Sequence, residues 1–478
     1  MGLGDVAWEV ADSLARGVEG RAAAVRGALF EPVIRLGVTG LSRAGKTVFI
    51  TSLIANLLDR GRMPQLFAAS SGAIRTAYLQ PQPDDTVARF EYERHLAALG
   101  GPAPHWPQST RSISQLRLSL KVQPAGILAG LRGVRTVHLD IVDYPGEWLL
   151  DLPLMEQSYG AWCQGAFDLA ERPARADVAA PWLRAVSAKD AAAAFDEGDA
   201  LALAAAFRAY LSAARGAGFS ACAPGRFLMP GDLEGSPALT FSPMRKPDRP
   251  GRKSLWREME RRFEAYKSHV VRPFFRDHFA RIDRQVVLLD ALGAIHDGPA
   301  ALEDMRAAMG DVLRAFRPGR NSWLSSILGK RVERILFAAT KADYLHHIQH
   351  ARLGAIMEAL LREARDRADF AGAETAAMSI ASVRATVEKS VTHKGRRLDC
   401  VQGVLEKTGK PALMYAGELP EDPARLLSPA RAGATRWLDQ DFDVMRFRPA
   451  RLNLSPGEGP AHIRLDKAAE FLLGDRLR

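Results

Sequence analysis

The sequence has few cysteines and no long apolar run. Only three cysteines occur in 478 residues, and Cys163, Cys222 and Cys400 stand far apart in no metal-ligand spacing. We therefore expect a reducing compartment and no structural metal. No apolar run reaches the roughly 18 residues of a membrane-spanning helix, and the first residues carry acids where a secretory signal would be apolar. A cytoplasmic protein is the expectation.

Nucleic-acid recognition signals are missing as well. There are no basic stretches with interleaved aromatics, no RNA-binding motif and no zinc finger, so nucleic acid is not an expected partner. The net charge is nevertheless +10, and part of it lies in RKPDRPGRK, residues 245–253. A solvated basic surface is one interpretation. A peripheral contact with an anionic surface such as the inner membrane is the other.

Short apolar runs alternate with helical periodicity along the chain. Strands are predicted at 33–39, 116–122, 134–144, 284–292, 334–344 and 376–383, and helices at 5–30, 47–59, 350–368 and 466–477. Segments 61–112 and 384–460 are predicted to be irregular, the second with short strand candidates at ALMYAG and FDVMRFRP. This alternation predicts an α/β fold with a mostly parallel sheet covered on both faces.

A phosphate-loop pattern, GLSRAGKT, lies between the first predicted strand and helix. The backbone N–H groups of such a loop and of the helix that follows it bind phosphate. Lys46 is predicted to bridge the β- and γ-phosphates, and Thr47 to hold Mg²⁺. A plain glycine turn is the alternative. The predicted contacts are Gly40, Ser42, Arg43, Ala44, Gly45, Lys46, Thr47 and Val48.

The segment DIVDYPG ends the strand predicted at 134–144. Asp143 and Gly146 have the DxxG spacing of nucleotide switches. We predict that Asp143 holds Mg²⁺ through water and that the Gly146 N–H bonds the γ-phosphate. A common Asp-Pro-Gly turn is the alternative, and Asp140 is a competing Mg²⁺ candidate.

The segment TKAD ends the strand predicted at 334–344. Asp343 is predicted to accept hydrogen bonds from the ring N–H and amine of guanine, while the Lys341 stem covers the purine face. Adenine lacks that donor pair, so such a site rejects it. Ser382 and Val383, in SVR, are predicted to support the base through their backbone, or else to be a plain strand end.

A γ-phosphate sensor is expected within HWPQSTRS, residues 105–112. Thr110 is predicted to contact Mg²⁺ and the γ-phosphate, with Ser109 as the alternative. Trp106 would stack on the base or ribose, or act as a packing anchor. Arg111 would offset phosphate charge or be solvated.

Taken in order, these segments resemble the YcjX-like family of bacterial P-loop NTPases over nearly the whole chain. The resemblance implies a GTP-binding protein with GTPase activity, a stress-linked role near the phage-shock response, and a large helical insertion. It rests on GLSRAGKT, WPQSTRSISQLRL, DYPGEWL, RQVVLLDAL, TKADY, SIASVRAT and HIRLDKAAEFLLGDRL.

One position departs from the Ras-type small GTPases. Glu147 follows DxxG where those enzymes keep a glutamine that orients water, and a carboxylate repels the γ-phosphate. Intrinsic hydrolysis is therefore expected to be slow or to use another device. Arg43 is a candidate cationic finger, worth roughly 10³–10⁵ in rate, or points to solvent or a partner. The predicted catalytic set is Lys46, Thr110, Gly146, Glu147 and Arg43.

Length suggests two or three units, as a soft expectation. We predict an N-terminal helix at 1–32, a first part of a G domain at 33–149, a helical insertion at 150–280, and a second part with a C-terminal extension at 281–478. The leading hypothesis is a Mg²⁺-dependent switch that hydrolyses GTP to GDP and signals to an unidentified protein effector. An ATPase of the same loop class and a nucleotide-binding adaptor with negligible hydrolysis are the alternatives.

Overall fold

The computed structural model describes most of the chain. The described residues are 31–41, 44–108, 112–123, 133–315, 332–362, 366, 373–437, 441–452 and 455–478. The helix predicted at 5–30 lies outside them.

A mixed, mostly parallel sheet organises the described residues. Its eight strands run in the order β2-β4-β5-β1-β6-β7-β8, with β3 paired to β4. They are β1 (Val33–Gly40), β2 (Ile74–Gln80), β3 (Ala88–Arg89), β4 (Ser114–Val122), β5 (Arg135–Asp143), β6 (Arg284–Leu289), β7 (Arg334–Ala339) and β8 (Glu374–Ser379). In the sheet, β5, β1, β6, β7 and β8 lie side by side and pair in parallel. The strand β4 is antiparallel to β2 and β5. The predicted α/β P-loop NTPase fold is confirmed.

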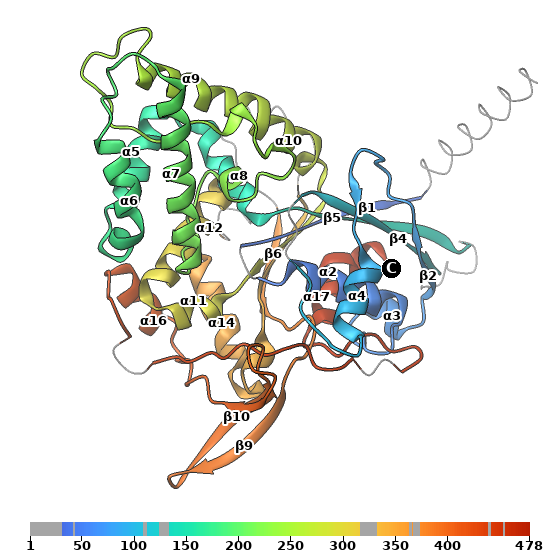
Figure 1. Cartoon of the computed structure of the whole chain (residues 1–478). Helices are drawn as coiled ribbons and strands as arrows, with labels where there is room; N and C mark the ends of the chain where they lie inside the picture. The colour runs from blue at the N-terminus through green and yellow to red at the C-terminus, as the bar shows by residue number, and fades with distance from the viewer. Residues whose placement is uncertain are drawn as a thin grey trace, which may run out of the picture.

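Alternating side chains bury both faces of the central strands. In β7, Leu336 and Ala338 join a core with α2 (Lys46–Leu58) and α17 (Leu465–Leu473). Ile335 and Phe337 join the opposite core, with α11 (Ala291–Asp297), α12 (Pro299–Ala315) and α14 (His350–Leu360). Figure 1 shows these helices on the two sides of the sheet. Continuous apolar strands follow from this two-sided burial.

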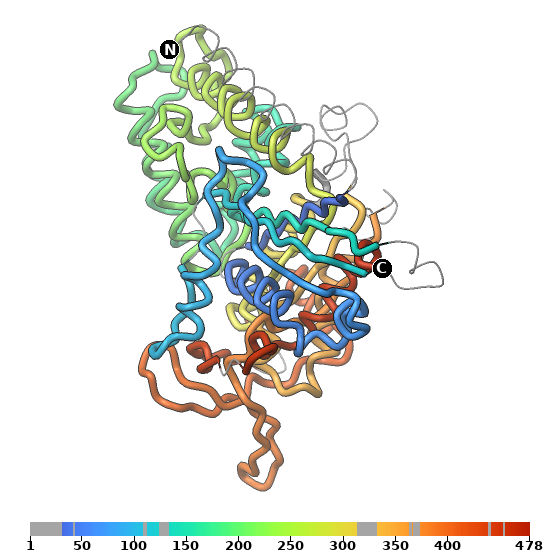
Figure 2. The backbone as a smooth tube through the Cα atoms, turned by 90° about the vertical axis from the view of Figure 1, so that its right-hand side faces the viewer, coloured from blue at the N-terminus to red at the C-terminus, as the bar shows by residue number. Residues whose placement is uncertain are grey.

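The segment between β5 and β6 is largely helical. It contains η1 (Gly146–Glu156), α5 (Tyr159–Ala170), η2 (Pro173–Arg175), α6 (Ala176–Ser187), α7 (Glu197–Gly216), α8 (Gly225–Leu228), η3 (Gly231–Leu233), η4 (Pro237–Leu239), α9 (Leu255–Tyr266), the π-helical turn η5 (Lys267–Val271), α10 (Arg272–Asp277) and η6 (Phe279–Arg281). Stacked rings fill its interior, such as Trp182 against Phe167 and Tyr210. Figure 2 shows this helical insertion at one end of the molecule.

Two predictions of irregular structure were wrong. Residues 61–112 contain α3 (Phe67–Ser70), β2, β3 and α4 (Tyr92–Gly100), and residues 384–460 contain β9 (Val387–His393), β10 (Arg396–Val404) and α16 (Ala424–Arg431). The strand candidate ALMYAG overlaps β11 (Pro411–Met414). Lys394 and Gly395, both with positive φ, form the tight turn between β9 and β10 that such a hairpin requires. FDVMRFRP forms no strand and contributes only a bridge between Phe447 and Leu405.

Short 3-10 turns complete the second half of the described chain: η7 (Ala342–Tyr344), η8 (His347–Gln349) and η9 (Gly474–Arg476). The three cysteines are free and buried. Within the described ranges, no helix is both long and apolar enough to cross a bilayer.

Candidate functional site

The phosphate-loop segment joins β1 to α2. Gly45 has φ 79°, the left-handed region that favours glycine, and α2 begins at the next residue. The Lys46 Nζ donates to the Gly40 carbonyl at 3.2 Å, so this side chain crosses back over the loop. In the described part of the chain, no side chain caps α2 and no acid lies in its first turn. The positive end of the helix dipole is therefore available to an anion.

The end of β5 lies beside this loop. Asp143 pairs in register with Val38 of β1 and is 1% exposed. A Cβ on Gly146 would lie 2.0 Å from the Gly40 carbonyl oxygen, so only glycine allows this close approach. Asp140, the competing metal candidate, is engaged elsewhere: Arg117 donates to both of its carboxylate oxygens, at 2.6 and 2.7 Å.

Asp343 follows β7 and is almost fully buried. Its Oδ2 accepts from the Ala385 N–H at 2.8 Å, and its carbonyl accepts from the Thr386 hydroxyl. Burial raises the pKa of the Asp343 carboxyl to about 6, against the Ala385 hydrogen bond and the charges of Arg384 and Lys341. The carboxylate is thus fixed in place with one acceptor oxygen committed to the backbone.

Lys341 has φ 60°, and its ammonium pairs with Asp290 at the start of α11. This pairing fixes the side chain that is predicted to cover the purine. Asp290 had been included only in a predicted strand, and no local pattern distinguished its role.

The SVR segment after β8 is fixed from two sides. Ser52 of α2 donates its hydroxyl to the Ser382 carbonyl. Ala381 exchanges backbone hydrogen bonds with Ile463, at 3.0 and 2.8 Å. The backbone predicted to support the base is therefore held by the phosphate-side helix and by the C-terminal segment.

Trp106 is anchored in the fold, as the packing alternative predicted, while its stacking on a base stays a prediction. Its indole N–H donates to the Phe447 carbonyl at 2.7 Å, which anchors the ring to a segment 341 residues away. The ring also lines the cavity described next.

A cavity of about 330 Å³ brings most of these segments together. This volume lies within the usual range for small-molecule sites. The cavity is lined by Ala44, Gly45, Lys46, Thr47, Val48, Trp106, Pro107, Thr340, Lys341, Asp343, Tyr344, Ala381, Ser382, Val383, Glu406 and Arg446. The phosphate-loop lysine and the buried aspartate of TKAD therefore face the same space.

The remaining predicted site residues are placed differently. Gly40, Asp143, Gly146 and Glu147 do not line this cavity, although Gly146 packs on Gly40. Ser42, Arg43, Ser109, Thr110 and Arg111 lie outside the described residues.

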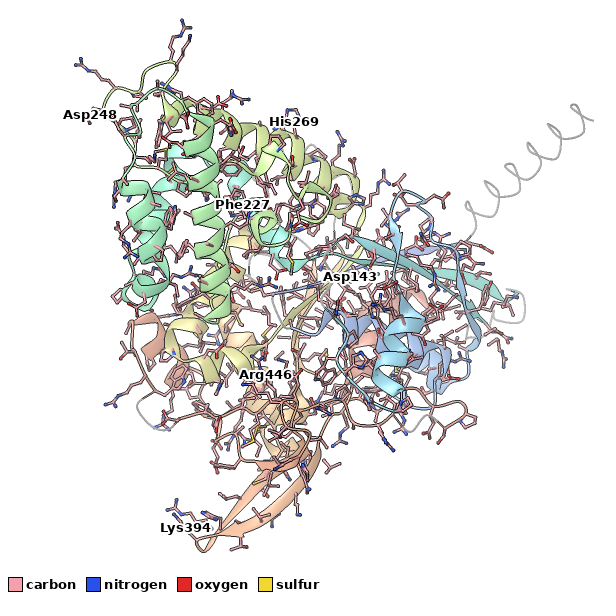
Figure 3. The ribbon with its side chains drawn as sticks, viewed as in Figure 1. Asp143, Phe227, Asp248, His269, Lys394 and Arg446 are labelled. Atoms are coloured by element: carbon pink, nitrogen blue, oxygen red, sulfur yellow. The ribbon has the colours of Figure 1, made fainter. Side chains whose placement is uncertain are left out.

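Sequence reasoning missed several residues that line the cavity. Tyr344 directly follows the aspartate of TKAD, and its position was a usable signal. Glu406 and Arg446 come from the segment that was expected to be irregular, and no motif marks them. In Figure 3, Arg446 lies between Asp143 and the hairpin tip at Lys394.

Glu147 faces a second, smaller cavity of about 100 Å³. Its Oε1 pairs with Arg215 of α7 at 2.8 Å, and its Oε2 has no hydrogen-bond partner in the described structure. Lys341, Tyr344 and Arg446 line both cavities. The carboxylate after DxxG is therefore held by the helical insertion, next to the larger cavity.

The helix-like turn after Gly146 is embedded in the insertion. The Trp148 indole donates to the Met229 carbonyl at 2.8 Å. Asp151 accepts from the Gly225 N–H and from the Tyr266 hydroxyl, both at 2.7 Å. Burial raises the pKa of Asp151 to about 6, while these two hydrogen bonds act against the rise.

Comparison with known proteins shows the family to which the chain belongs. The model of the YcjX-like family, DUF463, matches residues 34–477. The chain is 36% identical over 457 residues to the Ras-like GTPase YcjX of Escherichia coli (strain K12), covering 93% of this chain and 96% of that protein. It is 34% identical over 467 residues to the Ras-like GTPase YcjX of Shewanella oneidensis, covering 93% and 94%.

Proposed function

Because this chain belongs to the YcjX-like family and is a GTPase-like nucleotide-binding protein, we propose that it hydrolyses GTP to GDP and phosphate with Mg²⁺ and acts as a nucleotide-dependent switch. The observation that carries the proposal is the single cavity lined by both Lys46 and Asp343. One nucleotide in this cavity would place its phosphates at Lys46 and its base at Asp343.

The phosphate end offers cationic and N–H donors. Lys46 and the uncapped start of α2 would bind the β- and γ-phosphates. The Thr47 hydroxyl and the Asp143 carboxylate are buried oxygen donors of the kind that Mg²⁺ prefers. Bound with GTP, Mg²⁺ would neutralise charge on the β- and γ-phosphate oxygens. Thr110 stays a prediction from sequence for this site.

The base end supports guanine over adenine. Asp343 keeps a second carboxylate oxygen beyond the one that accepts from Ala385. Guanine presents an N–H pair to such a carboxylate, whereas adenine would leave it unsatisfied in a buried site. Trp106 and Lys341 line the same cavity and would cover the two sides of the base.

Slow intrinsic hydrolysis fits the placement of Glu147. Its pairing with Arg215 offsets a negative charge that would otherwise repel the γ-phosphate. In this conformation its carboxylate faces the smaller cavity, so it does not orient water in the larger one. This placement favours a protein that retains its nucleotide and hydrolyses it slowly. A nucleotide-binding adaptor would differ only in that its hydrolysis is negligible.

The contacts of η1 provide a route by which the helical insertion would sense the γ-phosphate. A shift of Gly146 on hydrolysis would move Glu147, Trp148 and Asp151, each of which contacts the insertion. We propose that the insertion presents this change to a protein effector. A stress-response role rests on the family resemblance, and a peripheral membrane contact rests on the exposed basic segment 245–253.

The test is to identify the nucleotide that copurifies with the protein and then to measure phosphate release. We expect guanine nucleotide in the released fraction, and slow phosphate release from GTP that stops when EDTA removes Mg²⁺. Copurified adenine nucleotide would support the ATPase alternative. Tight guanine-nucleotide retention with no phosphate release would support the adaptor.

A further inference from the structure

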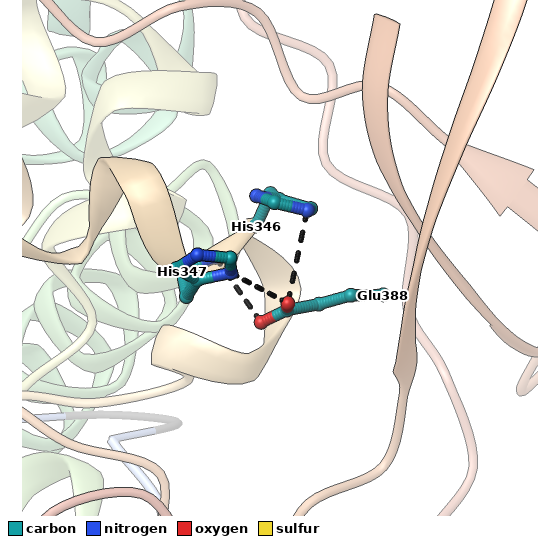
Figure 4. A group of neighbouring side chains, drawn as sticks. All are labelled: His346, His347 and Glu388. Carbon is teal, nitrogen blue, oxygen red and sulfur yellow. Dashed lines mark hydrogen bonds and ion pairs between the residues drawn. The ribbon is translucent and has the colours of Figure 1, made fainter.

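Three potential metal ligands meet just outside the base end of the nucleotide cavity. His346 and His347 follow the TKAD segment, and Glu388 lies on β9. One ligand atom from each residue lies within 4.8 Å of the others. Figure 4 shows both imidazole rings facing the carboxylate. None of the three lines the nucleotide cavity.

The distances suit a single ion after a small adjustment. The His346 Nε2 is 3.7 Å from the Glu388 Oε2, and the His347 Nδ1 is 2.7 Å from the same oxygen. Ligand atoms at 2.0–2.1 Å from a tetrahedral Zn²⁺ lie about 3.4 Å apart. The His347 side chain is 65% exposed, so it has room to turn and open that separation.

The His346 imidazole lies at this point with one ring nitrogen unbonded within the described residues. Its side chain is 9% exposed, and its Nδ1 has no hydrogen-bond partner in the described structure. Buried imidazole nitrogens are usually bonded, so this residue is atypical. The centroids of the two rings are 4.4 Å apart, so both imidazoles lie close enough to share one ion.

We propose that His346, His347 and Glu388 form a binding site for a divalent transition-metal ion, with Zn²⁺ as the natural ligand. Two imidazoles and one carboxylate are a Zn²⁺ ligand set. Since His347 faces solvent, the fourth coordination position is open to water. The site differs from the proposed Mg²⁺ position, where hydroxyl and carboxylate oxygens are the donors.

A neighbouring cation competes with the metal. The Arg384 Nη2 lies 4.0 Å from the Glu388 Oε1, and its side chain is 40% exposed. The guanidinium would have to turn toward solvent when an ion binds. Removing it takes away a like charge from the site.

Occupancy of this site would brace the base end of the nucleotide cavity, an effect that rests on the proposed function. The ion would join the segment after Asp343 to β9. Ala385 and Thr386, just before β9, already bond Asp343. We therefore expect Zn²⁺ to slow GDP release.

Zn²⁺ titration of the full-length chain, without a histidine tag and freed of metal by chelation, tests the site by calorimetry. We expect one equivalent to bind, and Co²⁺ to give a visible absorption band. His347→Asn and Glu388→Gln should each weaken Zn²⁺ binding by at least about 10-fold. His393→Asn, at the exposed end of the same strand, is the matched control and should bind like the unmodified chain.

Arg384→Gln should tighten Zn²⁺ binding, because it removes a positive charge beside the ion. A cluster with only a structural role would not show this effect. Absence of a Zn²⁺ equivalent, equal binding by His347→Asn, or unchanged affinity in Arg384→Gln would overturn the assignment. The titration needs no nucleotide, so its result stands apart from the GTPase proposal. Release of a fluorescent GDP analogue, with and without Zn²⁺, then tests the bracing separately.

Discussion

The base end of the proposed nucleotide cavity and the DYPG segment beside its phosphate loop are held by different parts of the molecule. At the base end, Asp343 bonds Ala385, Ser382 bonds Ser52 of α2, and Ala381 pairs with Ile463 near the C-terminus. These contacts all lie within the sheet, its helices and the C-terminal segment. The proposed base end is therefore fixed by contacts within this part of the molecule.

The DYPG segment packs on Gly40 of the phosphate loop without lining the cavity, and the helical insertion holds the chain that follows it. Beyond Gly146, the chain is fixed by Arg215 on α7, by Gly225 on α8 and by Tyr266 on α9. We propose a division of labour in which the base end selects the nucleotide base and the DYPG segment reports the phosphate state.

Lys46→Ala should have the largest effect, because it removes the phosphate-loop lysine that lines the larger cavity. A hydrogen bond to a charged group is worth about 1.5–3 kcal/mol. The phosphates also lose the positive charge of the lysine that would pair with them. We expect no measurable GDP binding by calorimetry. Lys394→Ala, at the hairpin tip in Figure 3, is the control and should bind normally.

Asp343→Asn should change base choice and leave phosphate binding intact. The amide can no longer accept both guanine N–H groups, which costs about 1–3 kcal/mol, or roughly 5- to 150-fold in affinity. Xanthine carries an oxygen in place of the amine, so the variant should gain affinity for xanthosine diphosphate. Competition against a fluorescent GDP analogue measures both changes. A variant that still prefers GDP would count against the assignment.

Arg215→Ala should destabilise the fold and slow hydrolysis together. It leaves the buried Glu147 carboxylate without its partner, at a cost of about 1–3 kcal/mol on the scale of an unsatisfied buried group. Adding Glu147→Gln should restore much of the stability, since no charge then remains. Urea unfolding of the four-member cycle measures the coupling, and additive effects of the two substitutions would contradict it.

Guanine binding should weaken in mild acid. Burial raises the pKa of Asp343 to about 6, and only the ionised carboxylate can accept both guanine N–H groups. GDP affinity should therefore be full above pH 6 and fall with pH below it, by about 10-fold for each unit. Comparison with Asp343→Asn removes the titration of the phosphates. Parallel pH profiles for the two proteins would exclude this carboxyl as the cause.

Arg249→Ser should give the smallest effect, at the end of the insertion farthest from the hairpin, near Asp248 in Figure 3. A basic residue at an anionic membrane surface contributes about 1 kcal/mol. Sedimentation with anionic vesicles should show modestly weaker binding, and none with neutral vesicles. Identical sedimentation of the variant and the unmodified chain would remove the membrane proposal.

The positions of the motifs at strand ends were predictable, because parallel strands end at the same edge of a sheet. A parallel strand followed by GLSRAGKT, DYPG, TKAD or SVR brings each motif to the same edge of the sheet. The observed order of strands then places Lys46 and Asp343 in one cavity. Short apolar runs were enough to find β1, β5, β6 and β7. These strands are buried on both faces, so their apolar residues follow one another without interruption.

The remainder depends on contacts between distant residues, which no local pattern encodes. Trp106 bonds Phe447, Arg215 pairs with Glu147, and Asp290 pairs with Lys341. The strand β2 lies at the edge of the sheet, where only its first residue is buried and no alternation of buried and exposed residues marks it. The hairpin of β9 and β10 is mostly exposed, and its Lys-Gly turn was the one available signal.

The most direct measurement is an experimental structure of this chain with bound GDP. A single nucleotide should occupy the larger cavity, with a phosphate oxygen about 2.7–3.2 Å from the Lys46 Nζ and the guanine N1 at a similar distance from the Asp343 carboxylate. A nucleotide that contacts Lys46 while its base points away from Asp343 would contradict the account.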